Sequence, residues 1–439
     1  MLSNTFETLT RINEEFEKGF TSASSLAKLM GCNEEGIYGA KRTFSYNPNS
    51  QTILELYPEF EPLVDKVSDL IQSLSRKLDE DSNNSQLWKT LGYCYLTLGD
   101  FPKAFSTSLR VSADQNDPTF LYALGIIYSH YKYFDNSINC FQQVLQISPN
   151  SIFSSEINFL FGIIYRKVQK YDFSLIYFQK SLDSPPNGLL PEDVQMQIAY
   201  TYQFTDRSSL SNDIYSNIYS KYPKSQSFLQ QYCLYLFIQS KGINAESLRS
   251  LLSYSLNLYP NDPTFLLISS RLAMLQNDTT TAYENLISCV NYCNDAPSFW
   301  CELGTLYYRN DQINDAYIAF QKALDLNPDF FEPYLNMGLI YEQRNQYQNA
   351  NQLYITAQQK FPNNPIINER IASNNSKLNN KQRPQLMCVK DTKLIPSSVE
   401  EFSEIYLMAT PKLPAECFGN CEMADEFAKL SSYPKSFFK

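Results

Sequence analysis

Small and apolar side chains recur along this chain at a constant interval. The clearest block consists of Trp300, Leu303, Gly304, Tyr307, Ala316, Phe320, Ala323 and Pro328, and it reappears as Tyr334, Met337, Gly338, Tyr341, Ala350, Tyr354, Ala357 and Pro362. In each block the apolar positions are spaced as on one face of two successive helices. The proline then ends the second helix, because proline cannot continue a helix interior. The pattern predicts one helix–turn–helix unit over residues 300–328 and a second over 334–362.

The same pattern extends upstream. Copies are centred on Gly92, Gly125, Gly162 and Ala199, and weaker copies fall between residues 227 and 297, which gives about eight units over 85–363. A helix–turn–helix period of about 34 residues with this layout is the signature of the tetratricopeptide (TPR) repeat. We therefore expect an all-α protein, a right-handed superhelical solenoid of TPR units whose concave face binds other proteins.

The patterning also suggests a division of the chain. Residues 1–84 are expected to form a helical extension or cap, residues 85–378 the TPR superhelix with a last capping helix, and residues 379–439 a mostly disordered tail. Within the tail, Ser398-Val-Glu-Glu401 is a capping box that leads into Phe402, Ile405 and Tyr406. A short amphipathic helix there would dock on a groove of this chain or of a partner. The alternative is an unstructured linker with chance apolar residues.

Charge and composition narrow the class of protein. The net charge is −10, so direct binding of nucleic acid is not expected, because that affinity comes largely from neutralising phosphates. The sequence shows no secretory leader and no apolar run long enough to span a membrane. The ten cysteines are then expected to stay reduced, which places the protein in the nucleus or the cytoplasm.

Catalytic and metal-binding patterns are missing from the sequence. His130 is the only histidine, and its place at the end of a helix suits a surface or groove position. The closest approach to a metal cluster is Cys289, Cys293 and Cys301, whose spacing does not match the usual zinc sites. No glycine-rich phosphate-binding loop is present. We therefore expect a protein that is not an enzyme and holds no cofactor and no metal.

The first helix of each unit is expected to line the concave groove. The positions that flank the packing residues give a candidate binding surface of Tyr122, Ile126, Phe159, Ile163, Met196, Tyr200, Thr305, Leu335 and Leu339. This surface is apolar and aromatic, which suits an amphipathic helix or an extended apolar peptide as the ligand. The alternative is that these residues pack against neighbouring helices.

Several segments resemble one branch of TPR proteins. Residues 120–145, 154–182 and 192–203 resemble the TPR region of the UTX histone demethylase, and residues 299–308 (FWCELGTLYY) are similar both to that protein and to the TPR subunit of the yeast general transcriptional corepressor. The resemblance implies a nuclear scaffold in transcriptional regulation. The implied partners are a WD-repeat corepressor, DNA-binding transcription factors and histone-modifying subunits. A demethylase domain is not expected, since the tail after residue 380 holds no histidine.

Two other roles fit the same sequence. The first is a structural TPR subunit of a large assembly such as a ubiquitin ligase. The second is a chaperone cofactor, but TPR grooves that hold acidic chaperone tails carry lysines at these positions, and Lys89 is the only lysine among the positions considered.

Overall fold

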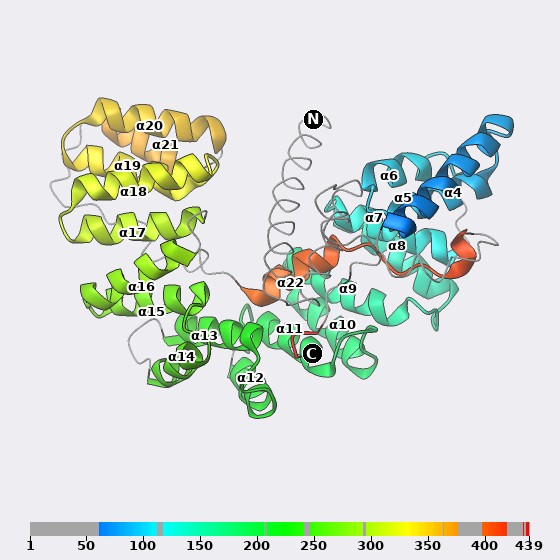
Figure 1. Ribbon diagram of the computed structural model, residues 1–439, viewed down its shortest axis with the longest axis horizontal. Coiled ribbons are helices and arrows are strands. Elements are labelled where there is room, and N and C mark those ends of the chain that lie inside the picture. Colours follow the sequence, from blue (N-terminus) through cyan, green and yellow to red (C-terminus); the bar gives the residue numbers. More distant parts are fainter. Residues whose placement is uncertain are drawn as a thin grey trace. The chain divides into compact units, whose positions relative to one another are not determined.

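The computed structural model describes residues 61–111, 117–205, 207, 209–240, 246–292, 296–362, 364–375, 397–418, 433 and 436–438. Every regular element in these residues is a helix (Figure 1). The contacts group the chain into two compact units. Unit 1 comprises residues 1–221 and 399–439, and unit 2 comprises residues 222–398.

Unit 1 is built from a leading helix and four helix–turn–helix pairs. The leading helix is α4 (Glu61–Glu80), and the pairs are α5 (Ser85–Thr97) with α6 (Phe101–Ser108), α7 (Pro118–His130) with α8 (Phe134–Ile147), α9 (Ser154–Lys167) with α10 (Tyr171–Asp183), and α11 (Pro191–Tyr202) with α12 (Ser209–Lys221). The C-terminal helix α22 (Ser398–Leu407) and the 3-10 helix η3 (Ala415–Phe418) follow at the end of the chain.

Unit 2 contains four further pairs and a closing helix. The pairs are α13 (Gln226–Ser240) with α14 (Glu246–Leu258), α15 (Pro263–Leu275) with α16 (Thr279–Tyr292), α17 (Pro297–Arg309) with α18 (Ile313–Leu326), and α19 (Phe331–Gln343) with α20 (Tyr347–Lys360). The closing helix is α21 (Pro365–Asn375), which packs on α20. Figure 1 shows α15 to α20 as successive pairs.

The predicted fold class is confirmed, since the described helices form eight successive pairs over residues 85–360. The weakly patterned stretch from 227 to 297 also forms two complete pairs. The division into three domains stays a prediction. Helix α4 lies within the predicted extension, whose residues 1–60 are outside the described residues, and α22 lies within the predicted tail.

Close approach of the two helices in a pair explains the glycines of the sequence pattern. A Cβ atom added at Gly125 would lie 2.5 Å from Phe141 Cε1, far inside van der Waals contact. An added Cβ at Gly162 would overlap the ring of Phe178 in the same way. The glycine of the first helix thus receives the aromatic ring that the second helix of the pair presents toward it.

Serine replaces the usual small alanine on the second helix in three pairs of unit 1. Ser137 Oγ donates to the Gly125 carbonyl oxygen at 2.9 Å, and Ser174 Oγ donates to that of Gly162 at 2.7 Å. Both hydroxyls are fully buried, so these bonds satisfy a polar group that would otherwise be costly to bury. The serines therefore join the two helices of a pair by a hydrogen bond as well as by packing.

The turn within a pair begins with a residue in the left-handed backbone region. Among the residues that the structure describes, five that are not glycine adopt it, with φ values of 59° to 62°: Lys132, Gln169, Asn277, Asp311 and Asn345. A left-handed residue after a helix allows its last carbonyl groups to be capped. Residues other than glycine are strained in this conformation, because their Cβ atom approaches the backbone too closely.

Replacing Gln169 with glycine is therefore expected to raise the free energy of unfolding of unit 1 by about 0.5–1 kcal/mol. Glycine adopts a positive φ without strain, and this gain outweighs its larger freedom in the unfolded chain. Urea denaturation followed by circular dichroism measures the change. The matched control is Gln179→Gly on the exposed face of α10, which should lower stability by about 0.5–1 kcal/mol. Two changes of the same sign would contradict the interpretation.

Candidate protein-interaction site

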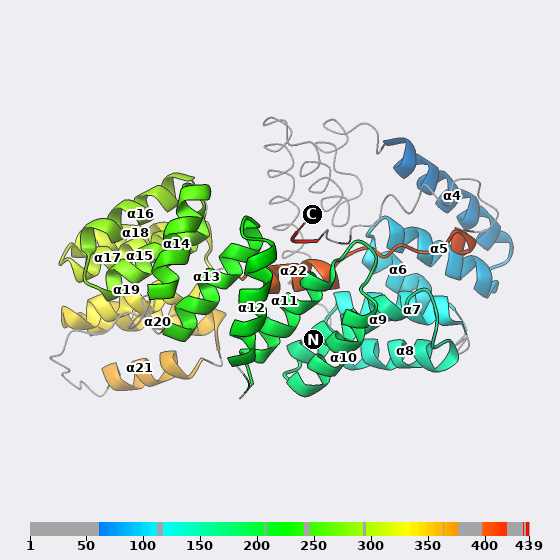
Figure 2. The ribbon, with the colours of Figure 1, turned by 90° about the horizontal axis from the view of Figure 1, so that it is seen from below.

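The first helix of each pair in unit 1 packs against a C-terminal part of the same chain. Residues 399–418, Tyr433 and 436–438, here called the C-terminal segment, contribute buried apolar side chains to the core of unit 1. Helix α22 lies beside α9 and α11 (Figures 1 and 2), and η3 packs on α5. We call the residues of α7, α9 and α11 that contact the segment the docking surface.

Aromatic side chains form the apolar part of this contact. Phe402 and Tyr406 lie four residues apart on α22 and therefore share one face of the helix. The ring of Phe159 on α9 lies 4.8 Å from that of Tyr406 and 6.3 Å from that of Phe402, in edge-to-face arrangements. Tyr406 also stacks on Tyr433 at 4.7 Å. Such pairs stabilise a contact by about 0.5–1.5 kcal/mol each beyond their burial.

A buried polar group lies at the centre of the docking surface. Arg166 Nη2 donates to Ser403 Oγ at 2.6 Å and Nη1 lies 3.3 Å from Thr201 Oγ1. The Ser403 hydroxyl in turn lies 3.2 Å from Gln197 Oε1. Arg166 is only 4% exposed, and its guanidinium also lies over the ring of Tyr200. The Ser403 hydroxyl thus accepts a hydrogen bond from Arg166, and it lies 2.7 Å from the Val399 carbonyl oxygen of its own helix.

Opposite charges flank this centre. Lys167 Nζ lies 2.5 Å from Glu400 Oε2 and 2.6 Å from Glu404 Oε1, so one lysine bridges two successive turns of α22. Lys132 Nζ lies 3.7 Å from Glu404. Burial alone would raise the pKa of Glu400, but the positive charges of Arg166 and Lys167 hold it below its ordinary value. The glutamate is therefore ionised in the docked helix.

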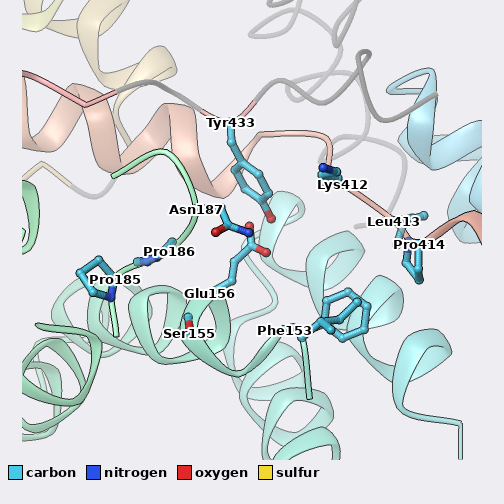
Figure 3. Close-up of a pocket in the computed structure, with 11 residues that line it drawn as sticks. Phe153, Ser155, Glu156, Pro185, Pro186, Asn187, Lys412, Leu413, Pro414 and Tyr433 are labelled. Atoms are coloured by element: carbon cyan, nitrogen blue, oxygen red, sulfur yellow. The ribbon is translucent and has the colours of Figure 1, made fainter. Parts of the chain in front are cut away.

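A tyrosine cluster surrounds the carboxyl group of Glu156 at the start of α9. Tyr406 Oη lies 3.5 Å from Glu156 Oε1, and the hydroxyls of Tyr122 and Tyr433 are 3.0 Å apart. Burial raises the pKa of Glu156 to about 6, although hydrogen bonds from Tyr433, Tyr122 and Tyr406 oppose the shift. Figure 3 shows Glu156 and Tyr433 pointing toward each other at a cavity of about 300 Å³. Two of these tyrosines belong to the C-terminal segment, which completes the cluster.

Glu156 makes the stability of unit 1 depend on pH. The folded chain keeps the carboxyl proton up to the raised pKa, whereas the unfolded chain releases it at the ordinary value. The folded state therefore binds more protons between about pH 4.5 and 6, and stability from this group is lost as pH rises through that window. Because Glu156 lines a cavity that admits water, we expect a change of about 1 kcal/mol.

The measurement is urea unfolding of the wild-type chain and of Glu156→Gln between pH 4.5 and 7. Glutamine keeps the shape of the side chain and cannot ionise. The wild-type free energy of unfolding should fall relative to that of the variant as pH rises. A difference that stays constant over this range would mean that the carboxyl group is not held protonated.

The predicted binding residues are all buried in the structure. Exposed fractions are 9% or less for Tyr122, Ile126, Phe159, Ile163, Met196, Tyr200, Thr305, Leu335 and Leu339. The first six lie on α7, α9 and α11 of unit 1, and the last three lie on α17 and α19 of unit 2. Tyr122 and Phe159 contact Tyr433 and α22, and Tyr200 lies within hydrogen-bonding reach of Glu400. Binding of another protein by any of the nine stays a prediction.

The remaining predicted residues contribute mainly to packing between helices. Ile126, Ile163 and Met196 are at most 1% exposed within unit 1. In unit 2, Thr305 Oγ1 donates to the Cys301 carbonyl oxygen of its own helix at 3.0 Å. Burial of these side chains is compatible with the alternative of packing against neighbouring helices, which stays a prediction.

Charged residues of the docking surface were not predicted from the sequence. The predicted groove comprises only the two positions that flank each packing residue, whereas Arg166 and Lys167 follow Tyr165 at the end of α9. Basic residues at a helix end are common because they interact favourably with the helix dipole. One feature of the sequence could have predicted them. Residues 400–404 contain three glutamates, and a helix with such an acidic face is expected to pack against basic side chains.

The other chemical candidates have ordinary environments. His130 is buried, so the surface or groove position predicted for it is wrong, and its ring stacks on that of Phe101 with centroids 3.7 Å apart. Within the described residues no three histidine, cysteine, aspartate or glutamate side chains gather as metal ligands would. Cys293 lies outside those residues. None of the described helices is long and apolar enough to cross a membrane.

Comparison with known proteins agrees with the repeat architecture. Family models of the tetratricopeptide repeat match residues 118–151, 297–330 and 319–352. These ranges correspond to the pair α7–α8 and to the helices from α17 to α20. The chain thus contains tetratricopeptide repeats, and stacked repeats of this kind in general form surfaces that bind other proteins.

Two curated relatives are general transcriptional corepressors. The chain is 27% identical over 134 residues to corepressor trfA of Dictyostelium discoideum, which covers 30% of this chain and 10% of that protein. It is 29% identical over 152 residues to corepressor ssn6 of Schizosaccharomyces pombe, which covers 32% of this chain and 13% of that protein. The matches span only about a tenth of the length of these relatives.

Among solved structures, yeast Tom70 is similar in fold. It is 12% identical to this chain, with a TM-score of 0.48, and the match covers 82% of this chain and 88% of that one.

Proposed function

We propose that this protein is a non-catalytic scaffold of a nuclear transcriptional corepressor complex, which bridges DNA-bound factors to a corepressor partner. The similarity of its repeats to those of two general transcriptional corepressors supports this proposal most directly. The partners would be a WD-repeat corepressor, DNA-binding transcription factors and histone-modifying subunits. Several weak contacts on one scaffold gain affinity through their effective concentration.

The docking surface supports the scaffold role by its chemistry. Phe159 offers an aromatic face, and Lys167 and Arg166 offer positive charge beside it. The surface already holds one amphipathic helix, α22, and recognition of a helix in a groove is a common way in which proteins bind partners.

A promoter-tethering assay tests the proposal. The full-length chain is fused to a DNA-binding domain of known specificity, and transcription of a reporter that carries its sites is measured. Reduced transcription relative to the DNA-binding domain alone is expected, because a corepressor acts where it is recruited. Unchanged transcription with the fusion bound at the promoter would contradict the proposal.

Affinity purification of the tagged full-length chain from its own cells identifies the partners. A WD-repeat protein, histone-modifying subunits or DNA-binding factors are expected among the co-purified proteins. Recovery of ubiquitin-ligase subunits or chaperones in their place would assign the chain to one of the alternative assemblies.

A further inference from the structure

We propose that the docking surface of α7, α9 and α11 binds an acidic amphipathic helix of a partner protein, and that α22 is the intramolecular competitor for this site. The partner helix would carry two aromatic side chains four residues apart, each preceded two positions earlier by a glutamate. Helix α22 shows this pattern in Glu400, Phe402, Glu404 and Tyr406. The inference rests on the proposed function only in taking this surface as a site for partners.

Each element of the pattern has its own receptor group. The two aromatic side chains contact the single ring of Phe159, which requires a spacing of one helical turn. The two glutamates contact the single ammonium group of Lys167, which requires the same spacing on an adjoining face. A helix with only one of these features would leave either Phe159 or Lys167 without its contact.

The polar character of the contact favours a ligand site over a permanent core. Ion pairs between partly exposed side chains contribute about 0–1 kcal/mol, and the side chains of Lys167 and Glu404 are 20% and 32% exposed. Apolar residues of similar volume often stabilise a fixed core at least as well as buried ionic groups. The chain instead places Arg166, Ser403 and Gln197 at the centre of the contact, where they select one helix over others.

Helix α22 is also too short to be stable alone. It has 10 residues, whereas isolated helices below about 12–15 residues are marginal in water. Its helical form therefore depends on docking.

Competition between α22 and a partner helix is effective because α22 is part of the same chain. For an effective concentration of about 1 mM and an intrinsic dissociation constant of about 0.1 mM, the surface would be open in about one molecule in ten. A partner would then bind about tenfold more weakly than to the open surface.

A labelled peptide of residues 396–411 probes the site in the full-length protein. We expect weak binding to the wild-type chain, because its surface is occupied. In the full-length release variant, Phe402→Ala with Tyr406→Ala, peptide affinity should rise about tenfold, as measured by fluorescence anisotropy. A peptide carrying the same two alanine substitutions is the matched ligand control and should not bind. Circular dichroism of the release variant checks that its repeats stay folded.

A charge exchange keeps the test independent of the folding of the release variant. Lys167→Glu in the otherwise wild-type chain should weaken docking of α22 and admit a peptide with Glu400→Lys and Glu404→Lys. The unaltered peptide should not bind to this variant. Lys170→Glu, at an exposed lysine three residues along the chain, is the matched control and should behave as the wild type.

Three outcomes would overturn the inference. The first is equal peptide affinity for the wild-type chain and a folded release variant, and the second is no binding of the exchanged peptide to Lys167→Glu. The third is a wild-type dimer in sedimentation that the release substitutions convert to monomer, since α22 would then be supplied by a second copy. These results do not depend on nuclear partners, so they separate failure of this inference from failure of the corepressor role.

Discussion

Replacing Arg271 with methionine is expected to lower the free energy of unfolding of unit 2 by about 3–5 kcal/mol. Arg271 on α15 forms an ion pair through its Nη2 with Glu302 Oε1 on α17, and the two side chains are 1% and 0% exposed. The substitution removes the positive charge and leaves the carboxylate in the core. An uncompensated buried charge is far more costly than the loss of the pair itself. Calorimetry of the full chain measures the change.

Two further variants show whether burial is the cause. The double variant Arg271→Met with Glu302→Leu should recover most of the lost stability, because neither charge of the pair then remains in the core. Lys360→Met removes one member of a pair with Asp329 whose side chains are 33% and 39% exposed. We expect that change to stay within about 0.5 kcal/mol. A double variant as unstable as Arg271→Met alone would show that packing and not charge determines the loss.

The repeat architecture could be predicted because its packing is local in the sequence. The interval from Gly304 to Phe320 equals that from Gly338 to Tyr354, and an added Cβ at either glycine would meet the corresponding ring. When the same contact recurs at a constant spacing, the residues that make it recur in the sequence with the same period. For this reason even the weakly patterned pairs between 227 and 297 could be predicted.

Occupation of the docking surface could be predicted only in part. The capping box at Ser398 and the apolar residues after it indicate a helix, and α22 begins at Ser398. The sequence leaves its target open between a groove of this chain and one of a partner. Phe159 and Phe402 lie in widely separated parts of the sequence, and a single contact of this kind leaves no periodicity to read. The prediction that Phe159 lines a groove also omitted Arg166 and Lys167, which lie on the same helix.

The two compact units have no counterpart in the predicted boundaries. The periodic pattern continues across residues 221 and 222, where unit 1 is followed by unit 2 in the sequence. It continues because every helix pair has the same spacing of packing residues. Long-range contacts of the C-terminal segment, such as Phe437 N with Asp193 Oδ1 at 2.8 Å, add residues 399–439 to unit 1. Local patterning contains no information about which repeats such a segment joins.

Gly162→Ala is expected to lower the free energy of unfolding of unit 1 by about 2 kcal/mol, although alanine is the better helix former by about 1 kcal/mol. The new methyl group would overlap the ring of Phe178, which must move. That ring contacts Phe159 at 5.6 Å, and Phe159 in turn contacts α22. The substitution should therefore also weaken docking of α22 and raise the affinity for the labelled peptide of residues 396–411.

Gly92→Ala is the matched control, because it makes the same chemical change in the first pair of unit 1. There the nearest atom to an added Cβ would be Thr107 Oγ1 at 3.0 Å, a tight contact in place of an overlap, and none of the nearest atoms belongs to a ring. We expect a result between no change and a gain of about 1 kcal/mol from helix propensity. Urea denaturation compares the two variants. Equal effects would mean that the approach of Phe178 to α9 limits neither the stability of unit 1 nor the form of its docking surface.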